Sequence, residues 1–257
     1  MTQPLPEVPL LEGHGLHLTF GAVRALDGVA IGIVPGEVVA IVGESGSGKS
    51  TLLRVLSGQL EPGAGEVRYA GRALSGMSEA ERRRLLRSEW GVVHQNPRDG
   101  LRMGVSAGGN VGERLMAAGE RSFAAIRREA AEWMRRVELD PARMDELPRN
   151  FSGGMQQRLQ IARTLVTRPR LVFMDEPTGG LDVSVQARLL DLIRGLVADL
   201  GLAVILVTHD IAAARLLAHR MLVMREGRVV EEGLTDRVLD DPRHPYTQLL
   251  VASVLAA

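Results

Sequence analysis

Residues 43–50 of this chain of 257 residues read GESGSGKS. This stretch matches the pattern G-x-x-x-x-G-K-[ST] and follows the apolar run EVVAIVG (37–43), which predicts a strand. The residues after it, KSTLLRVLSGQL (49–60), have the apolar spacing of a helix. In that context the glycines let backbone N–H groups surround phosphate oxygens at a helix N-terminus, whose dipole favours anions. The sequence therefore predicts a phosphate-binding loop, the P-loop.

Lysine occurs once in the chain, inside this loop. Of the 31 basic residues, 30 are arginine and the remaining one is Lys49. A compact ammonium on a flexible stem fits among phosphate oxygens, whereas the planar fork of arginine is larger. We therefore expect an ATP site in which Lys49 reaches the β- and γ-phosphates and Ser50 ligates Mg²⁺. The residues expected to surround the phosphates are Gly43, Glu44, Ser45, Gly46, Ser47, Gly48, Lys49, Ser50 and Thr51.

The composition is that of an ordinary globular protein and excludes several kinds of site. Hydrophobic residues make up 45% and charged residues 24%, and the formal net charge is zero, so bulk electrostatics do not indicate a nucleic-acid partner. The absence of cysteine excludes disulfides and Cys-ligated metals and agrees with a reducing compartment. The sequence shows no secretory signal and no run of about 18 apolar residues that could cross a bilayer. We expect a soluble, cytoplasmic protein that binds no nucleic acid and does not insert into a membrane.

Buried strands alternate with helices in the second half of the chain. The apolar runs LVFMDE (171–176) and LAVILVTH (202–209) alternate with the helical segments 183–200 and 211–220. Apolar strands separated by helices predict a parallel sheet covered on both faces. The texture of residues 99–150, glycine-rich and then amphipathic, predicts a mostly helical insertion.

Short signals mark further elements. β-rich runs at 16–21 and 29–34 predict an N-terminal β part. Ser78 and Glu81 form the pattern of a capping box at the start of a helix over 78–89. Glu226-Gly227 predicts the turn of a hairpin within 221–233.

A second part of the nucleotide site is predicted where the run LVFMDE ends. Asp175, at the carboxyl end of a buried strand, is placed to hold Mg²⁺ through Ser50 or a water molecule. Glu176 is placed to orient or deprotonate the attacking water. Because strands often end in acidic residues, Asp175 and Glu176 indicate a nucleotide site only in combination with the P-loop.

Residues 151–166, FSGGMQQRLQIARTLV, predict a second helix end able to bind an anion. Ser152 is a good N-cap, and Gly153 and Gly154 leave the first backbone amides accessible. A single ATP does not need two such ends from one chain.

The complete set of motifs resembles the ATP-binding-cassette (ABC) ATPases. FSGGM (151–155) resembles the ABC signature, Gln95 in VVHQNP the Q-loop, GGLD (179–182) the D-loop and His209 in VTHD the switch histidine. Phe20 in LTFG resembles the aromatic residue that stacks on adenine. The motifs follow one another in the family's order over essentially the whole chain.

The resemblance implies a fold and a mode of action. The fold is α/β, a P-loop NTPase of ABC type with a RecA-like parallel-sheet core, an N-terminal antiparallel β part and a helical subdomain insertion. The signature residues Ser152, Gly153 and Gly154 of one subunit complete the ATP site of a second ABC subunit, either an identical chain or a related ABC protein. The division expected is a core of residues 8–98 and 160–240, a helical signature subdomain of residues 99–159 and a C-terminal tail of residues 241–257.

The resemblance also implies roles in hydrolysis of ATP to ADP and phosphate. Glu176, His209 and Gln95 are the expected catalytic residues, with His209 at the γ-phosphate. Mg²⁺ is expected on Ser50, Gln95 and Asp175, and Asp182 is expected to couple the two ATP sites of a dimer.

Some of these residues have alternative interpretations. Phe20 alone could be a core aromatic, Gln95 a surface amide and His209 a hydrogen-bonded histidine at a strand end. The sequence departs from the family pattern with Phe151 in place of leucine, Met155 in place of glutamine, and a D-loop that begins Gly-Gly instead of Ser-Ala. None of these departures removes a ligand of phosphate, metal or water.

Three longer stretches resemble one branch of the family. Residues 77–119, 173–197 and 231–250 are similar to the ABC subunit of the bacterial carbon–phosphorus lyase system, which degrades phosphonates. That resemblance implies docking on the subunits of the lyase core complex, and we expect residues 96–115 to contribute to the docking surface. The tail DDPRHPYTQLLVASV and the motif FSGGM also resemble ATPases of peptide and nickel importers, so a subunit of a peptide, nickel or phosphonate importer remains an alternative. A regulatory module that binds ATP without turnover is a third.

Overall fold

The computed structural model describes residues 9–255, which fall into two compact units. The first unit combines the residues up to Arg82 with those from Gly201 onward, and the second comprises residues 83–200. The start of the expected core, at residue 8, and the last two residues of the expected C-terminal tail lie outside the described residues. The expected division into core, signature subdomain and tail stays a prediction.

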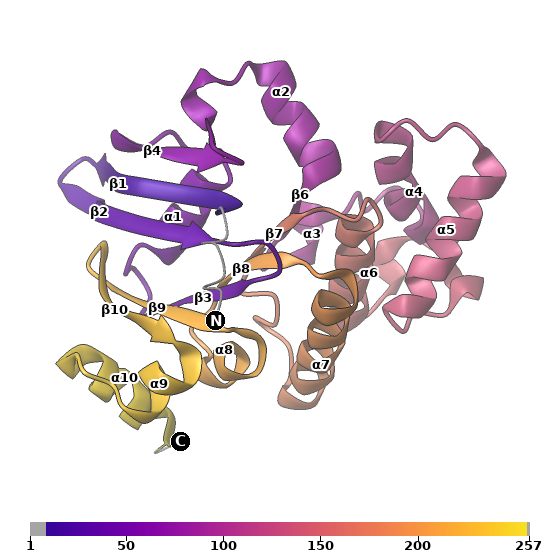
Figure 1. Cartoon of the computed structure of the whole chain (residues 1–257). Helices are drawn as coiled ribbons and strands as arrows, with labels where there is room; N and C mark the ends of the chain where they lie inside the picture. Colours follow the sequence, from indigo (N-terminus) through magenta and orange to yellow (C-terminus); the bar gives the residue numbers. More distant parts are fainter. Residues whose placement is uncertain (1–8, 256–257) are drawn as a thin grey trace, which may run out of the picture. The chain divides into compact units, whose positions relative to one another are not determined.

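An antiparallel sheet forms the N-terminal part of the first unit, as the sequence predicts. Strands β1 (Leu11–Phe20), β2 (Val23–Ile33), β4 (Ala64–Tyr69) and β5 (Arg72–Ala73) lie in the order β2-β1-β4-β5. β1 pairs with β2 from Leu11 opposite Ile33 to Phe20 opposite Val23. Figure 1 shows this sheet beside the helix that follows the P-loop.

Parallel strands carry the P-loop in the same unit. β3 (Val38–Val42) lies parallel to β8 (Ala203–Val207) on one side and β9 (Arg220–Arg225) on the other. Every residue of β3 and β8 is buried, which explains their continuous apolar sequences. β10 (Arg228–Leu234) returns antiparallel to β9, and the predicted turn is confirmed by the positive φ angles of Glu226 and Gly227, 50° and 79°.

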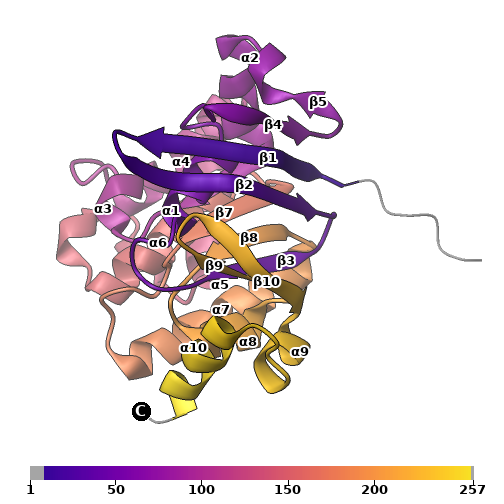
Figure 2. The ribbon, with the colours of Figure 1, turned by 90° about the vertical axis from the view of Figure 1, so that its left-hand side faces the viewer.

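Three helices from the C-terminal part of the chain pack against these strands. α8 (Ile211–Leu217), α9 (Thr235–Asp240) and α10 (Pro245–Leu255) lie together near β9 and β10 in Figure 2. The segment expected as a tail is therefore largely helical. Its tyrosine joins a buried apolar cluster that consists of Ala40, Val42, Ile211, Ala214, Met221, Val223, Val238, Leu239 and Tyr246.

Two predicted helices are shorter than expected. α1 (Lys49–Leu56) ends four residues before the predicted end, because Gly58 adopts a left-handed φ of 69°. The predicted helix 78–89 is α2 (Glu79–Arg84) followed by a π-helical turn (Leu85–Glu89), and a 3₁₀ turn (Leu74–Gly76) precedes it. The capping box is confirmed: the Ser78 N–H donates to Glu81 Oε2 at 2.9 Å and the Glu81 N–H donates to Ser78 Oγ at 3.3 Å.

The second unit contains two parallel strands and the three longest helices, α5, α6 and α7. β6 (Trp90–Val93) lies parallel to β7 (Leu171–Asp175), and Trp90 meets Phe173 edge to face with ring centroids 5.3 Å apart. α4 packs against both α5 and α6, which confirms the predicted helical insertion (Figure 1). The helical segments are α3 (Pro97–Gly100), α4 (Ala107–Ala117), α5 (Phe123–Arg136), α6 (Gly153–Leu165), α7 (Val183–Leu200) and the 3₁₀ turns Pro141–Arg143 and Pro148–Asn150.

Within residues 9–255, no helix combines the length and the apolar character that crossing a membrane requires.

Candidate nucleotide-binding site

The P-loop is a backbone cradle that only glycine can form at two positions. Gly43 and Gly48 have φ angles of 148° and 104°. A Cβ atom on Gly43 would lie 2.2 Å from the carbonyl oxygen of Met224, and one on Gly48 would lie 2.4 Å from that of Ala25. α1 begins at Lys49 without a side-chain cap, and the N-terminus of a helix favours an anion.

Lys49 is buried beneath the loop that it belongs to, with 6% of its surface exposed. Its Nζ atom donates to the carbonyl oxygens of Gly43 and Glu44, both at 2.7 Å, and lies 3.4 Å from Ser47 Oγ. These acceptors compensate the burial of the ammonium charge. A guanidinium would have to place a wider planar group in the same confined space, which supports the reason given for the single lysine.

The other residues of the P-loop differ in exposure. Glu44, Ser45, Gly46 and Ser50 are exposed, whereas Gly48 and Thr51 are half-buried and Ser47 is buried. The Ser50 hydroxyl therefore lies at an accessible helix start, where a metal ion bound to phosphate could reach it.

Phe20 and His209 lie in the first unit as well. Phe20 ends β1 and is 51% exposed, so the alternative of a core aromatic is wrong. His209 is exposed and follows β8 by two residues. Ile41 of β3 pairs with Val207 of β8, and the Thr208 N–H donates to the Ile41 carbonyl oxygen at 3.2 Å. β3 and β8 therefore end at the same edge of the sheet. His209 lies at this edge, where the P-loop begins.

In the second unit, Gln95 and Glu176 lie together at the carboxyl ends of β6 and β7. Val93 pairs with Met174, so the residues after these strands emerge at one edge. Gln95 Nε2 donates to Glu176 Oε2 at 3.0 Å. Asp175 ends β7 and is half-buried, and Glu176 follows it with a φ of 42°. Gln95 is exposed, and its side chain has a defined hydrogen-bond partner in Glu176.

The D-loop glycines have a structural reason. A Cβ on Gly179 would lie 3.1 Å from Gln95 Nε2 and 3.2 Å from the Glu176 carbonyl oxygen, so this position gives room to the glutamine side chain. Gly180 has a φ of 74°, a conformation that favours glycine. The unusual Gly-Gly pair thus fits the Gln95–Glu176 contact.

Asp182 stabilises the start of α7. Its Oδ1 atom accepts the Val185 N–H at 3.1 Å and the Ser184 hydroxyl at 2.9 Å. These hydrogen bonds, first that from Val185 and then that from Ser184, hold the pKa of the Asp182 carboxyl below its usual range. The carboxylate is therefore charged at neutral pH and exposed on the surface.

The signature segment forms the predicted capped helix end. Ser152 Oγ accepts the Met155 N–H at 3.4 Å at the start of α6. Gly153 is exposed, and Gly154 packs so closely that a Cβ atom would lie 2.6 Å from Val185 Cγ1.

The two departures in the signature pack around one arginine. The guanidinium of Arg143 lies 4.4 Å from the ring centroid of Phe151, and its Nη1 atom lies 3.6 Å from Met155 Sδ. Both residues are thus explained by local packing.

Sequence reasoning missed a set of buried glutamines on α6. The His94 N–H donates to Gln160 Oε1 at 2.8 Å, and the His94 carbonyl oxygen accepts from Gln160 Nε2 at 3.0 Å and from Gln157 Nε2 at 3.2 Å. The signature helix is therefore bonded directly to the residue before Gln95. The one signal in the sequence was the spacing of Gln157 and Gln160, which places them on the same helix face.

Burial also affects His94 itself. Desolvation lowers the pKa of its imidazole and outweighs the opposing effect of the carboxylates Asp99 and Asp175. His94 is therefore neutral at physiological pH, and it contributes to the site through its backbone.

The candidate metal ligands are oxygen donors of the kind that Mg²⁺ prefers. The Ser50 hydroxyl belongs to the first unit, and the Gln95 amide oxygen and the Asp175 carboxylate belong to the second. Across residues 9–255, no three His, Cys, Asp or Glu side chains gather into a group that could hold a metal ion by themselves. A single carboxylate fits an ion that takes its remaining ligands from nucleotide phosphates and water.

The chain is similar to known proteins over most of its length. Residues 26–179 match a family model described as ABC transporter. The chain is 65% identical to the putative phosphonates utilization ATP-binding protein PhnK of Escherichia coli (strain K12), over 96% of this chain and 98% of the relative. It is 38% identical to the di/tripeptide transport ATP-binding protein DppF of Pseudomonas aeruginosa, over 95% of this chain and 75% of the relative.

A solved structure extends the comparison to the fold. The dimeric ATP-binding cassette MJ0796, in a post-hydrolysis state bound to ADP and Pi, matches with a TM-score of 0.79 and 31% identity, covering 88% of this chain and 98% of that one. The fold class predicted from the sequence is confirmed.

Proposed function

Since the chain belongs to the ABC transporter family of ATP-binding proteins, we propose that it is an ATP-hydrolysing subunit for phosphonate utilisation, which docks on the carbon–phosphorus lyase core complex in the cytoplasm. The observation that carries the proposal is the 65% identity to PhnK over nearly the full length of both chains. Hydrolysis would drive a conformational change in the complex. An importer ATPase is the second candidate, favoured by the 38% identity to DppF.

ATP binds to the P-loop through backbone amides and Lys49. The exposed ring of Phe20 stacks on the adenine. Ser50, Gln95 and Asp175 would hold Mg²⁺, which would neutralise charge on the phosphate oxygens.

Glu176 orients the attacking water and accepts its proton. The Gln95 amide, which donates to Glu176 at 3.0 Å, holds the carboxylate in one orientation. His209 contacts the γ-phosphate and keeps the water in line with it.

A second ABC subunit, identical or related, completes each site. The backbone amides at the N-terminus of α6, with Ser152, bind the γ-phosphate held by the other subunit. The exposed carboxylate of Asp182 lies at the start of α7, close in sequence to Glu176, and couples the two sites. A dimer of the cassette MJ0796 bound to ADP and Pi supports this arrangement.

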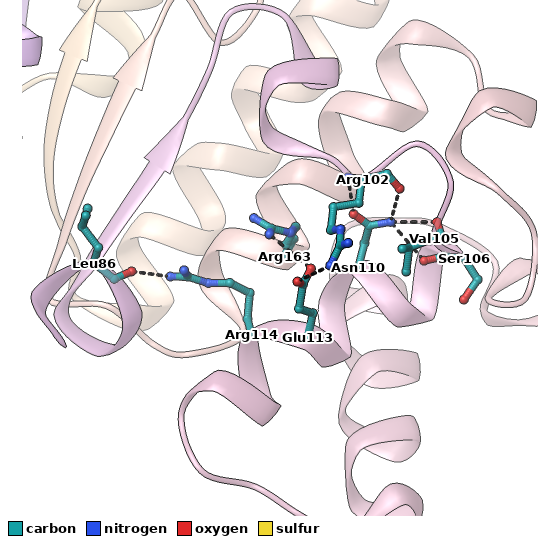
Figure 3. Close-up of polar contacts among 8 residues, drawn as sticks. All are labelled: Leu86, Arg102, Val105, Ser106, Asn110, Glu113, Arg114 and Arg163. Atoms are coloured by element: carbon teal, nitrogen blue, oxygen red, sulfur yellow. Dashed lines mark hydrogen bonds and ion pairs between the residues drawn. The ribbon is translucent and has the colours of Figure 1, made fainter. Parts of the chain in front are cut away.

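The segment 96–115 supplies part of the docking surface. Its glycine-rich turn is well ordered, because Asn110, which is fully buried, donates to the carbonyl oxygens of Arg102, Val105 and Ser106 at 2.9–3.1 Å (Figure 3). A rigid turn presents a defined surface to a partner at little cost in entropy.

Arginines surround a recess beside this turn. Arg114 donates to the Leu86 carbonyl oxygen at 2.9 Å, and Arg102 and Arg163 flank Glu113 at 2.8 and 3.5 Å (Figure 3). Asp99 also lines the recess, so two carboxylates, Asp99 and Glu113, balance part of the charge of three arginines, which leaves the recess positive.

Affinity purification of the full chain with ATP and Mg²⁺ tests the proposal. We expect subunits of the lyase core to copurify, whereas multi-span permeases would overturn it in favour of an importer. Glu176→Gln is expected to bind ATP, to lose hydrolysis and to fail to support growth on a phosphonate. The control Glu132→Gln, an exposed glutamate on α5, should behave like the wild type. Growth supported by Glu176→Gln would instead favour an ATP-sensing module without turnover.

A further inference from the structure

We propose that Tyr246 of α10 is a positioning residue for the P-loop, so that the C-terminal helix helps to set the affinity for nucleotide phosphates. The inference rests on the proposed role of the P-loop in binding ATP. α10 lies outside residues 26–179, the part that matches the family model.

The contact joins the helix to the first peptide group of the loop. The Glu44 N–H donates to the Tyr246 hydroxyl at 2.9 Å, and Tyr246 is 5% exposed. That N–H and the carbonyl group of Gly43 belong to one planar peptide unit and point in opposite directions. The Gly43 carbonyl oxygen accepts from Lys49 Nζ at 2.7 Å.

One rigid peptide is therefore held from both sides, by Tyr246 through its N–H and by Lys49 through its oxygen. A rotation of this peptide would break both contacts together. Gly43 has no side chain to restrict such a rotation and adopts a φ of 148°, so the orientation has to be imposed by partners outside it. Tyr246 thus helps to set where the Lys49 ammonium lies.

Tyr246 itself is firmly placed. Its ring belongs to the buried cluster of β3, β9, α8 and α9, and the Arg225 guanidinium lies 5.2 Å from the ring centroid. The start of α10 is fixed by Glu231, which accepts the N–H groups of Arg243 at 2.8 Å and His244 at 3.0 Å. The hydroxyl therefore approaches the loop from a rigid support.

A second contact to the loop comes from the β9–β10 turn. The Gly227 N–H donates to the Ser47 carbonyl oxygen at 3.0 Å. This bond involves backbone atoms on both sides and survives side-chain substitution. Removing the Tyr246 hydroxyl therefore isolates the contribution of α10.

Tyr246→Phe is the direct test, because it keeps the ring, its packing and the contact with Arg225. Loss of one neutral hydrogen bond corresponds to about a three- to tenfold change in an equilibrium constant. We expect the Kd for Mg-ATP, measured with the full chain by fluorescence titration, to rise by about that factor. The effect on hydrolysis should fall on KM more than on kcat, since the loop binds phosphate and does not activate water.

Tyr69→Phe is the matched control. Tyr69 is the other tyrosine of the chain, 4% exposed on β4 in the same unit, and it belongs to the antiparallel sheet. It should leave the Kd for Mg-ATP at the wild-type value. Thermal unfolding without nucleotide is recorded for all three proteins.

The outcomes separate this inference from the proposed function. If the wild type fails to bind Mg-ATP, the proposed function fails. If the wild type binds and Tyr246→Phe binds equally tightly, the positioning role is refuted while the proposed function stands. An equal rise in Kd for Tyr69→Phe would also overturn it, because the effect would then reflect general destabilisation.

Discussion

Gln160→Leu is expected to loosen the connection between α6 and the strand that leads to Gln95. Gln160 is 1% exposed and makes three hydrogen bonds, two with the backbone of His94 and one with Gln157 Oε1 at 3.1 Å. Leucine fills a similar volume, so little cavity is left. The main cost is the His94 N–H, which loses its acceptor in a partly buried position. Such an orphaned donor costs about 1–3 kcal/mol, and we expect a loss of about 2 kcal/mol in the free energy of unfolding.

The chain provides a built-in reporter for this measurement. Its two tryptophans, Trp90 on β6 and Trp133 on α5, are 2% and 1% exposed and both belong to the second unit. Urea unfolding followed by tryptophan fluorescence therefore reports on the unit that contains Gln160. The control Glu132→Gln, at an exposed glutamate on α5 of the same unit, should lose less than about 1 kcal/mol.

Gln160→Glu adds a pH dependence with a definite sign. A protonated carboxyl can reproduce one donor and one acceptor of the amide, whereas the ionised form is a buried charge facing a carbonyl oxygen. Burial therefore raises the pKa of this glutamate in the folded state above its unfolded value of about 4.3. The variant should be nearly as stable as the wild type below that value and should lose stability as the pH rises through the folded pKa.

The reasoning on Gln160 would be refuted by two results. One is a loss below about 0.5 kcal/mol in Gln160→Leu, which is within the range of ordinary surface substitutions. The other is a Gln160→Glu variant whose urea midpoint follows that of the wild type at every pH.

Three further predictions concern local contacts. Lys49→Arg should raise the Kd for Mg-ATP by at least about tenfold despite the conserved charge, and near-normal binding in a nucleotide titration would contradict the packing argument. Gly179→Ala should push the Q-loop glutamine aside, lower ATP turnover and destabilise the fold by about 1 kcal/mol, and unchanged turnover would contradict the steric argument. Hydrogen bonds from the backbone of Ser78, from Arg72 and from the Ser78 hydroxyl lower the pKa of Glu81 from 4.5 to about 2. The contribution of Glu81 to the stability of the folded state is therefore present above pH 4.5 and lost as the pH falls toward 2. NMR titration of the carboxyl group can follow this change, and Glu81→Gln should abolish the pH dependence.

Features that depend on neighbours along the chain could be predicted from the sequence. The P-loop, the capping box of Ser78 and Glu81 and the turn at Glu226-Gly227 all involve residues within a few positions of one another. Their conformations follow from local sterics and short hydrogen bonds, which residue type and spacing largely determine. Local signals predicted the ends of helices less accurately. The predicted helix 49–60 ends at Leu56, because Gly58 adopts a left-handed backbone conformation.

The resemblance to a family assigned roles to Gln95, Glu176 and His209, but it did not say how their positions are maintained. Gln95 contacts Glu176 across 81 positions of sequence, and Gly179 leaves room for that contact. No pattern within the D-loop indicates that its first glycine faces a glutamine far away in the chain.

The α/β class, the P-loop and the capped signature helix follow from the sequence, because glycine conformations, caps and apolar periodicity act over a few residues. The packing of distant elements, in contrast, buries Gln160 against His94, 66 positions away, and brings the Tyr246 hydroxyl to Glu44, 202 positions away. The sequence pattern of a helix is the same whether a polar side chain on it faces water or a backbone group. Which of the two it meets depends on how distant elements pack, and hydrogen bonds formed on burial then make that choice specific.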